Sequence, residues 1–153
     1  GKRFLEKSPA NSLRTRFLQS IYPDAAFVII FRNGFAVSEG IRRKRLFDPE
    51  RPHLAGLPTT IAEAAEQWKN TNRILLDDRP HLTHHMALRY EDLVTKPAPT
   101  IGAVLRFCGC DPAKCAIPQF HRDLNNQQIA RLFPFEKDVI ESVASDMLHA
   151  LEY

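Results

Sequence analysis

Runs of apolar residues and helical apolar periodicity define the elements expected in the first part of this chain. Residues 25–31 form a continuous apolar run without alternation, which is typical of a strand covered on both faces. Shorter apolar stretches at residues 2–5 and near residues 86–88 are interpreted as two further strands. Residues 12–21 place apolar side chains on one helical face, and Asn11 is a suitable N-cap. The first strand, this helix and the second strand should therefore form a parallel, right-handed βαβ unit.

The rest of the chain is predicted to be mainly helical, apart from one long loop. Thr60 and Glu63 form a capping-box pattern at the start of one helix. Residues 47–59 have no regular pattern and contain three prolines, and loops of this length often act as lids or binding loops. The expected helices run from Gly34 to the basic residues 42–45, from residue 60 to about residue 75, from residue 99 to 107, and from residue 136 to 151.

Charged or hydrogen-bonding residues follow each of the three predicted strands. Glu6 and Lys7 come after the first strand, Arg32 follows the second, and Tyr90 follows the third. In open parallel sheets, ligands bind beyond the carboxyl ends of the strands. The sequence therefore predicts an α/β fold with a ligand site at this edge of the sheet.

Each of these residues has a functional and an ordinary interpretation. A carboxylate beside an ammonium group, as in Glu6 and Lys7, could act as a general base next to a positive charge, but the pattern alone favours a surface pair before a turn. Arg32, together with backbone N–H groups at a helix start, suits a phosphate, or else it pairs with a nearby carboxylate. Tyr90 could flank a nucleobase or be an ordinary residue at a strand end.

Composition restricts the class of protein. The chain of 153 residues, 44% apolar and 25% charged, has the composition of one ordinary globular domain. A net charge of +3 is too small to indicate a nucleic-acid partner without a concentrated patch, and it suits a modest anionic ligand. No stretch approaches the roughly 18 apolar residues of a membrane span, and no signal-peptide pattern is present. The compartment stays open, and the cytoplasm is favoured.

The three cysteines are interpreted as small buried residues rather than as a metal or disulfide site. Cys108, Cys110 and Cys115 are an odd number within eight positions, which argues against a disulfide framework. A zinc site that combined them with His121 would require a tetrahedral arrangement. We therefore expect no metal, and we expect the cysteines to pack as small apolar side chains.

The motifs in their order along the chain are far more specific than any one of them. Together they resemble the sulfotransferase family over residues 5–111, and again at residues 151–153. The segments that carry the resemblance are Glu-Lys-Ser-Pro-Ala-Asn at 6–11, Leu-Arg-Thr-Arg-Phe-Leu-Gln at 13–19, Tyr-Pro-Asp-Ala at 22–25, Arg-Asn-Gly-Phe-Ala-Val at 32–37, Trp68 with Asn72 and Arg73, Arg-Tyr-Glu-Asp-Leu-Val at 89–94, and Phe-Cys-Gly-Cys at 107–110.

The resemblance implies a fold, a reaction and a role for individual residues. The fold would be a three-layer α/β domain over residues 1–153, with a mainly parallel sheet of the P-loop nucleotide-transferase type. The reaction would move a sulfuryl group from 3′-phosphoadenosine-5′-phosphosulfate to a hydroxyl or amine of a glycan or small molecule, without a metal. Glu6 would be the catalytic base of the Glu-Lys-Ser/Thr-Pro subgroup, and Lys7 would lie near the transferred group. Arg32 would hold the 3′-phosphate, and Tyr90 would lie near the adenine.

Two departures from the family pattern affect these expectations. Members usually carry a serine eight residues after the arginine, on the 3′-phosphate, but that position is Gly40 here, and Ser38 is a possible substitute. The Gly-rich loop that cradles the 5′-phosphosulfate is also not found, so the first βα unit of the fold is expected to be missing. The same observation disfavours a nucleotide kinase.

The missing unit leaves two hypotheses open. In the first, the chain is the C-terminal portion of an enzyme, and an upstream segment or another copy of the chain completes the sheet. In the second, it is a degenerate, non-catalytic nucleotide-binding or assembly module. An exposed sheet edge would favour pairing with another chain in that case.

Overall fold

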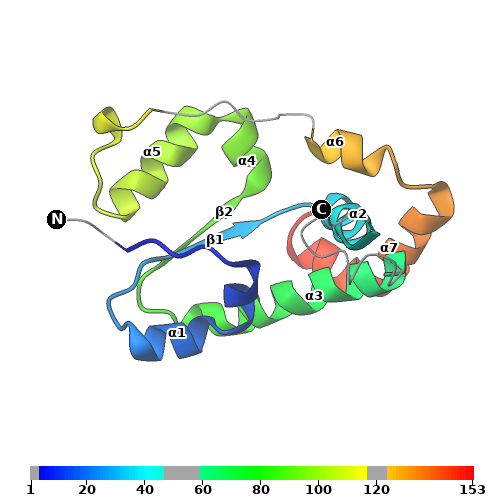
Figure 1. Cartoon of the computed structure of the whole chain (residues 1–153), viewed down its shortest axis with the longest axis horizontal. Helices are drawn as coiled ribbons and strands as arrows, with labels where there is room; N and C mark the ends of the chain where they lie inside the picture. The colour runs from blue at the N-terminus through cyan, green and yellow to red at the C-terminus, as the bar shows by residue number, and fades with distance from the viewer. Residues whose placement is uncertain (1–3, 47–58, 117–123) are drawn as a thin grey trace.

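The computed structural model describes residues 4–46, 59–116 and 124–153, and Figure 1 shows how its elements are arranged. The elements, in chain order, are the 3₁₀ turn η1 (Pro9–Leu13), α1 (Thr15–Ile21), β1 (Phe27–Phe31), α2 (Gly34–Leu46), α3 (Ile61–Asp78), the 3₁₀ turn η2 (Arg79–His81), β2 (His85–Arg89), α4 (Tyr90–Thr95), α5 (Pro97–Phe107), the 3₁₀ turn η3 (Pro112–Lys114), α6 (Leu124–Ile129) and α7 (Pro134–Ala150).

Strands β1 and β2 pair in parallel, with Phe27 opposite His85 and Phe31 opposite Arg89. This confirms the predicted parallel sheet, and the two paired strands are those that precede Arg32 and Tyr90. Helix α3 runs along one side of the two strands, and α4 and α5 lie on the other side (Figure 1). Because the two strands run in the same direction and are paired along their whole length, the residues that follow β1 and β2 lie at the same end of the sheet, beyond the carboxyl ends of the strands.

Two apolar clusters stabilise this arrangement. In the first, Trp68 of α3 packs with Ile140, Ala144 and Leu148 of α7. In the second, the inward-facing residues of β1 pack against Leu75 of α3. Helix α3 therefore contributes to both clusters and fixes α7 relative to the sheet.

Most of the predicted helices are confirmed, and the capping box of α3 has the expected geometry. The Thr60 hydroxyl accepts a hydrogen bond from the Glu63 backbone N–H at 3.2 Å, and the Glu63 carboxylate accepts from the Thr60 N–H at 2.8 Å. Helices α2, α5 and α7 begin within two residues of the predicted positions. The predicted loop 47–59 lies outside the described residues, except for Thr59.

The predicted strand at residues 2–5 is wrong where the structure describes it. Phe4 and Leu5 have no regular secondary structure, and their side chains are 86% and 90% exposed. A strand needs a neighbouring strand to satisfy its backbone groups, and among the described residues no strand other than β1 and β2 is present. The parallel unit of this fold is therefore formed by β1 and β2, with α2 and α3 between them.

The helix predicted over residues 12–21 is confirmed only from Thr15 to Ile21, because the chain divides there into two shorter elements. Pro9 begins η1, and Arg14, with φ −148° and ψ 30°, separates it from α1. Asn11 caps no helix, since its side-chain oxygen accepts hydrogen bonds from the Arg14 guanidinium at 2.8 and 3.1 Å. Proline at the first helical position favours an earlier start than the sequence pattern suggested.

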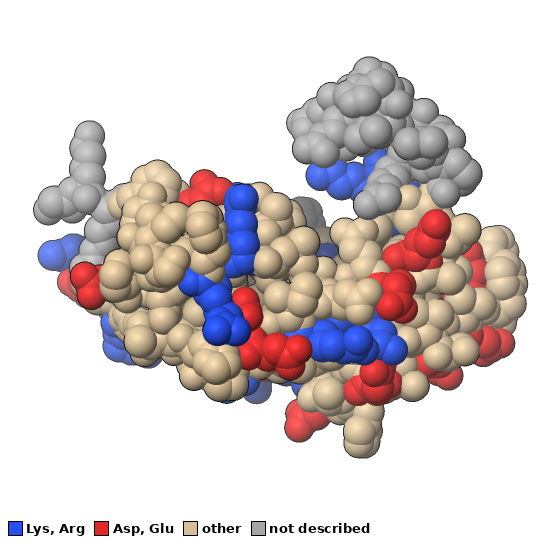
Figure 2. All heavy atoms as spheres, turned by 90° about the horizontal axis from the view of Figure 1, so that it is seen from below, with Lys and Arg blue, Asp and Glu red and all other residues tan. Residues whose placement is uncertain are grey.

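Surface charge is mixed on the face seen in Figure 2, where Lys and Arg side chains alternate with Asp and Glu. In the parts of the chain that the structure describes, no helix combines the length and the apolar character needed to cross a bilayer.

Candidate functional site

Arg32 and Tyr90 meet at the carboxyl end of the sheet, where their positions after β1 and β2 predicted that they would lie close together. The guanidinium carbon of Arg32 lies 4.4 Å from the centroid of the Tyr90 ring. A cation over an aromatic face is attracted by the ring quadrupole. The pair therefore presents one positive charge and one aromatic ring, both half-buried, at the edge where α/β folds bind ligands.

Neutral amides hold the Arg32 guanidinium. Its Nε donates to Asn125 Oδ1 at 2.8 Å, and its Nη2 donates to Gln128 Oε1. Within the described ranges Arg32 forms no ion pair with a carboxylate, in contrast to the alternative in which it pairs with a nearby carboxylate. Because a guanidinium has five N–H donors, several remain for an incoming anion, and the charge is not neutralised by its immediate partners.

Glu91 connects three parts of the chain around this arginine. Its Oε1 accepts from the Asn33 backbone N–H at 3.1 Å and from Asn125 Nδ2 at 2.6 Å. Its Oε2 accepts from the Tyr153 hydroxyl at 2.8 Å, and Arg89 lies 4.0 Å away as a counter-charge. Since Asn125 donates to Glu91, its oxygen must face Arg32, which fixes the orientation of the amide.

Tyr153 is held on both its ring and its hydroxyl. The Arg89 guanidinium stacks 4.3 Å from the ring centroid, and burial together with the hydrogen bond to Glu91 raises the pKa of Tyr153 above its ordinary value. The hydroxyl therefore remains a donor at neutral pH.

The backbone beside Arg32 is fixed by hydrogen bonds that leave few N–H groups for a ligand. The Trp68 indole N–H donates to the Arg32 carbonyl at 3.1 Å. The Asn33 side chain accepts from the N–H groups of Phe35 at 3.0 Å and Ala36 at 3.3 Å, so it caps α2. The sequence predicted free backbone N–H groups at this helix start, and that expectation is wrong for Phe35 and Ala36. An anion here would be bound mainly by side chains.

Among the described residues, Glu6 and Lys7 form no hydrogen bond or ion pair with Arg32 or Tyr90. Both side chains are exposed, and in the described residues Glu6 makes one hydrogen bond, from Asn11 Nδ2 at 3.4 Å. Their segment has no regular secondary structure.

Ser38 and Gly40 differ sharply in what they offer a ligand. Ser38 is completely buried, and its hydroxyl has no hydrogen-bond partner among the described residues. Its expected contact with a phosphate would require an exposed hydroxyl, which this position does not provide. Gly40 instead faces Gln128 of α6, since an added Cβ at residue 40 would lie 2.7 Å from the Gln128 Nε2 atom.

The amides of α6 are the functional candidates that sequence reasoning missed. Asn125 and Gln128 belong to a run of four amide residues at 125–128, which is the signal that could have drawn attention to this helix. Apolar periodicity could not find it, because the helix has six residues.

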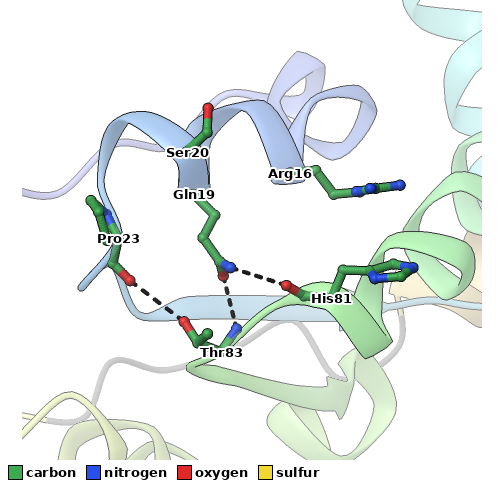
Figure 3. A pocket seen from close by; sticks show the side chains of 6 residues that line it. All are labelled: Arg16, Gln19, Ser20, Pro23, His81 and Thr83. Carbon is green, nitrogen blue, oxygen red and sulfur yellow. Dashed lines mark hydrogen bonds between the residues drawn. The ribbon is translucent and has the colours of Figure 1, made fainter.

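A pocket of about 380 Å³ lies at the opposite end of the sheet. Figure 3 shows the side chains that line it. It is formed between α1 and the segment that leads into β2, where Gln19 donates to the His81 carbonyl at 3.0 Å and accepts from the Thr83 N–H at 2.8 Å. Its lining residues are Arg16, Gln19, Ser20, Pro23, His81 and Thr83. Pro23 and Thr83 precede the strands, so this pocket lies at their amino ends and does not include Arg32 or Tyr90.

The cysteines are free thiols. Cys108 and Cys110 are half-buried, and Cys115 is exposed. Among the residues that the structure describes, no group of three His, Cys, Asp or Glu side chains could hold a metal ion. His121, which the zinc hypothesis required, lies outside the described residues.

Comparison with known proteins identifies the family. Residues 1–114 match the sulfotransferase family, which covers more than half of the sequence, so the chain belongs to this family. Among solved structures, the chain is similar to the sulfotransferase domain from the curacin biosynthetic pathway, with a TM-score of 0.65 and 18% sequence identity. The alignment covers 93% of this chain and 61% of that domain. No curated protein gave a match.

The structural likeness confirms the predicted fold class. At 18% identity it establishes an α/β fold of the P-loop type with a parallel sheet, and it carries no information about substrate. The chain spans less than two thirds of the length of that domain.

Proposed function

We propose that this chain binds the 3′-phosphoadenosine end of 3′-phosphoadenosine-5′-phosphosulfate and contributes to sulfuryl transfer to a hydroxyl or amine of a glycan or small molecule. The observation that carries the proposal is the Arg32–Tyr90 pair, in which a guanidinium and an aromatic ring lie 4.4 Å apart at the carboxyl edge of the sheet. This combination of groups suits a phosphate attached to a nucleoside.

The environment of Arg32 fits a phosphate ligand. Asn125 and Gln128 accept two of its N–H groups without adding negative charge, so the remaining donors keep the charge that recognises an oxyanion. Planar, charge-assisted contacts of this kind suit phosphate oxygens. We assign the 3′-phosphate to Arg32 and the adenine to the half-buried ring of Tyr90. Ser38 receives no ligand contact, because its hydroxyl is buried.

The chemical step is assigned to Glu6 and Lys7. The acceptor oxygen attacks sulfur, a new S–O bond forms, and the bond from sulfur to the bridging phosphate oxygen breaks. Glu6 takes the acceptor proton, and Lys7 stabilises the charge that develops on the transferred group. A sulfuryl group carries less charge than a phosphoryl group, so fixed cations of the protein are sufficient for this step. Both side chains are exposed, which leaves them open to an acceptor.

Calorimetric titration with 3′,5′-bisphosphoadenosine tests the binding half of the proposal. Replacing Arg32 by alanine removes a charge-assisted contact, so we expect Arg32→Ala to bind more weakly by about 1.5–3 kcal/mol. Arg16→Ala, at the pocket on the opposite end of the sheet, is the matched control and should bind as the wild type does. Equal affinity of the wild type and Arg32→Ala would refute the proposal.

A second candidate function, a non-catalytic assembly module that pairs through its sheet, is favoured by a different observation. Ile30 of β1 is 49% exposed, although parallel sheets are normally covered on both faces. Apolar side chains of the preceding elements are also at least half exposed: Leu13, Phe17, Ile21 and Tyr22. Light scattering after gel filtration, combined with a thermal-shift assay, separates the two functions. A dimer without a nucleotide-dependent shift favours assembly, and a monomer stabilised by 3′,5′-bisphosphoadenosine favours the transferase.

A further inference from the structure

Gln128 lies between Arg32 and Gly40 with half of its amide unused. Its Oε1 accepts a hydrogen bond from Arg32 Nη2. An arginine side chain can only donate, so the amide oxygen must face Arg32 and the Nε2 group must point away from it. Among the described residues, Gln128 Nε2 donates to no partner. The two N–H donors of this amide are therefore not engaged by any residue that the structure describes.

Gly40 provides the space that this amide occupies. A Cβ atom at residue 40 would lie 2.7 Å from Gln128 Nε2, closer than side chains pack in proteins. Gly40 lies inside α2, where glycine lowers helix stability relative to alanine. Its backbone gives no conformational reason for glycine, since Gly109 is the glycine with positive φ in the described part of the chain. The missing side chain thus has a steric use, which is to admit the Gln128 amide.

We propose that Gln128 Nε2 is a second phosphate donor, which binds the same phosphomonoester as Arg32, and that Gly40 is the residue that makes this possible. The inference rests on the proposed function and deepens it, because it concerns the same nucleotide site. Arg32 supplies the charge, while the amide supplies a directed donor without further charge. Asn125 has a different role, since both ends of its amide are already engaged by Arg32 and Glu91. Asn125 is therefore a positioning residue.

A Gln128 side chain that only positioned Arg32 would respond differently to substitution. If the amide only held Arg32 in place, its oxygen would matter and its nitrogen would not. A direct donor and a residue that only positions Arg32 would both act on the 3′-phosphate, so the two roles are separated by whether a hydroxyl placed at residue 40 can replace the amide. The phosphate that is contacted is identified with two ligands that differ by one phosphate. 3′,5′-Bisphosphoadenosine and adenosine 5′-monophosphate form such a pair, since the second lacks the 3′-phosphate.

The experiment measures the dissociation constants of both nucleotides for three single variants by calorimetry. Gln128→Ala removes the donor, and Gly40→Ala displaces it without changing any polar group. We expect each to weaken binding of 3′,5′-bisphosphoadenosine by about tenfold, with little change for adenosine 5′-monophosphate. Gly102→Ala is the control, because an added Cβ there meets Arg106 Nη1 at an ordinary 3.5 Å. Gly102→Ala should bind both nucleotides as the wild type does.

A double variant tests whether the position itself carries the contact. In Gly40→Ser combined with Gln128→Ala, a serine hydroxyl at residue 40 would enter the space that the amide leaves. We expect this variant to recover most of the affinity that Gln128→Ala loses for 3′,5′-bisphosphoadenosine. A residue that served only to hold Arg32 would show no such recovery.

The outcomes separate this inference from the function on which it rests. If Arg32→Ala loses affinity but Gln128→Ala does not, or if Gln128→Ala weakens both nucleotides equally, the role of Gln128 is refuted and the function stands. If the wild type binds neither nucleotide, the proposed function fails, and this inference fails with it. Thermal unfolding checks the fold, because alanine at residue 40 favours the helix and should not lower the melting temperature.

Discussion

The carboxyl-end cluster, which comprises Arg32, Tyr90, Glu91, Asn125 and Gln128, contrasts with the N-terminal segment, residues 4–8. In the cluster each side chain takes part in a stacking contact or a hydrogen bond with another member. In the N-terminal segment the apolar side chains at residues 4 and 5 are 86% and 90% exposed, and a single 3.4 Å hydrogen bond reaches the carboxylate at residue 6.

In the proposed function, the nucleotide would bind to side chains that are already held in place, whereas the transfer step would use side chains of a segment that is held less firmly. Groups that are already held in position lose little freedom when a ligand arrives, so they contribute affinity efficiently. Groups in a loosely held segment must be ordered before they can act. In the proposed function, nucleotide affinity therefore resides in the cluster, and the rate of transfer depends on residues 6 and 7.

The largest expected effect separates the two regions by function. Replacing Glu6 by glutamine removes the base but keeps the shape, so we expect the rate of sulfate transfer to fall by about 10² to 10⁴. The affinity for 3′,5′-bisphosphoadenosine should stay unchanged. Transfer is followed with a labelled donor and binding by calorimetry, and Glu66→Gln on the exposed side of α3 is the control. Transfer at the wild-type rate would remove Glu6 from the mechanism.

Gly34, where α2 packs against α3 and α7, is expected to affect the stability of the fold. A Cβ at residue 34 would lie 2.9 Å from two atoms of the Trp68 ring and 3.0 Å from Leu148, so Gly34→Ala overpacks the contact of α2 with α3 and α7. We expect a loss of about 1–3 kcal/mol in the free energy of unfolding, measured by urea titration. Binding of 3′,5′-bisphosphoadenosine should weaken as well, because the same Trp68 ring donates to the Arg32 carbonyl. A fully stable Gly34→Ala would show that this contact can relax.

The smallest effect concerns the pH dependence of the cluster. Since the pKa of Tyr153 is raised in the folded chain, its contribution to stability is fully present below the ordinary value of 10.0 and is lost as pH rises beyond it. Tyr153→Phe should lower the free energy of unfolding by about 0.5–1.5 kcal/mol at neutral pH. The difference between wild type and variant should shrink above pH 10.0, as measured by unfolding at a series of pH values. A difference that grows with pH would contradict the hydrogen bond to Glu91.

The sequence predicted those parts of the site that depend on local pattern. The continuous apolar run that ends at residue 31 correctly predicted that Arg32 lies at the carboxyl end of the sheet. The same reasoning applied to Tyr90, which directly follows the next strand. The amides of α6 could not be found in this way, because Asn125 and Gln128 lie 93 and 96 positions from Arg32. Their contact with Arg32 depends on how α2 and α6 pack, and the run of amides at 125–128 marks the helix but not its partner.

The error at residues 4 and 5 has a related physical cause. An apolar stretch has the same composition whether it pairs in a sheet or lies exposed, and the outcome depends on a neighbouring strand. The break at Arg14 was also missed, because the apolar pattern of residues 12–21 does not record that η1 already starts at Pro9 and that Arg14 leaves the helical conformation.

The choice of amides rather than carboxylates around Arg32 has a consequence for association kinetics. A carboxylate partner would cancel the field of the guanidinium at short range, whereas Asn125 and Gln128 leave it to act on a ligand before contact. Its reach is then set by the Debye length, about 8 Å at physiological ionic strength, so added salt should slow the capture of a doubly phosphorylated nucleotide. In the proposed function, the two uncharged side chains Asn125 and Gln128 would therefore affect the rate at which the nucleotide is captured as well as its affinity.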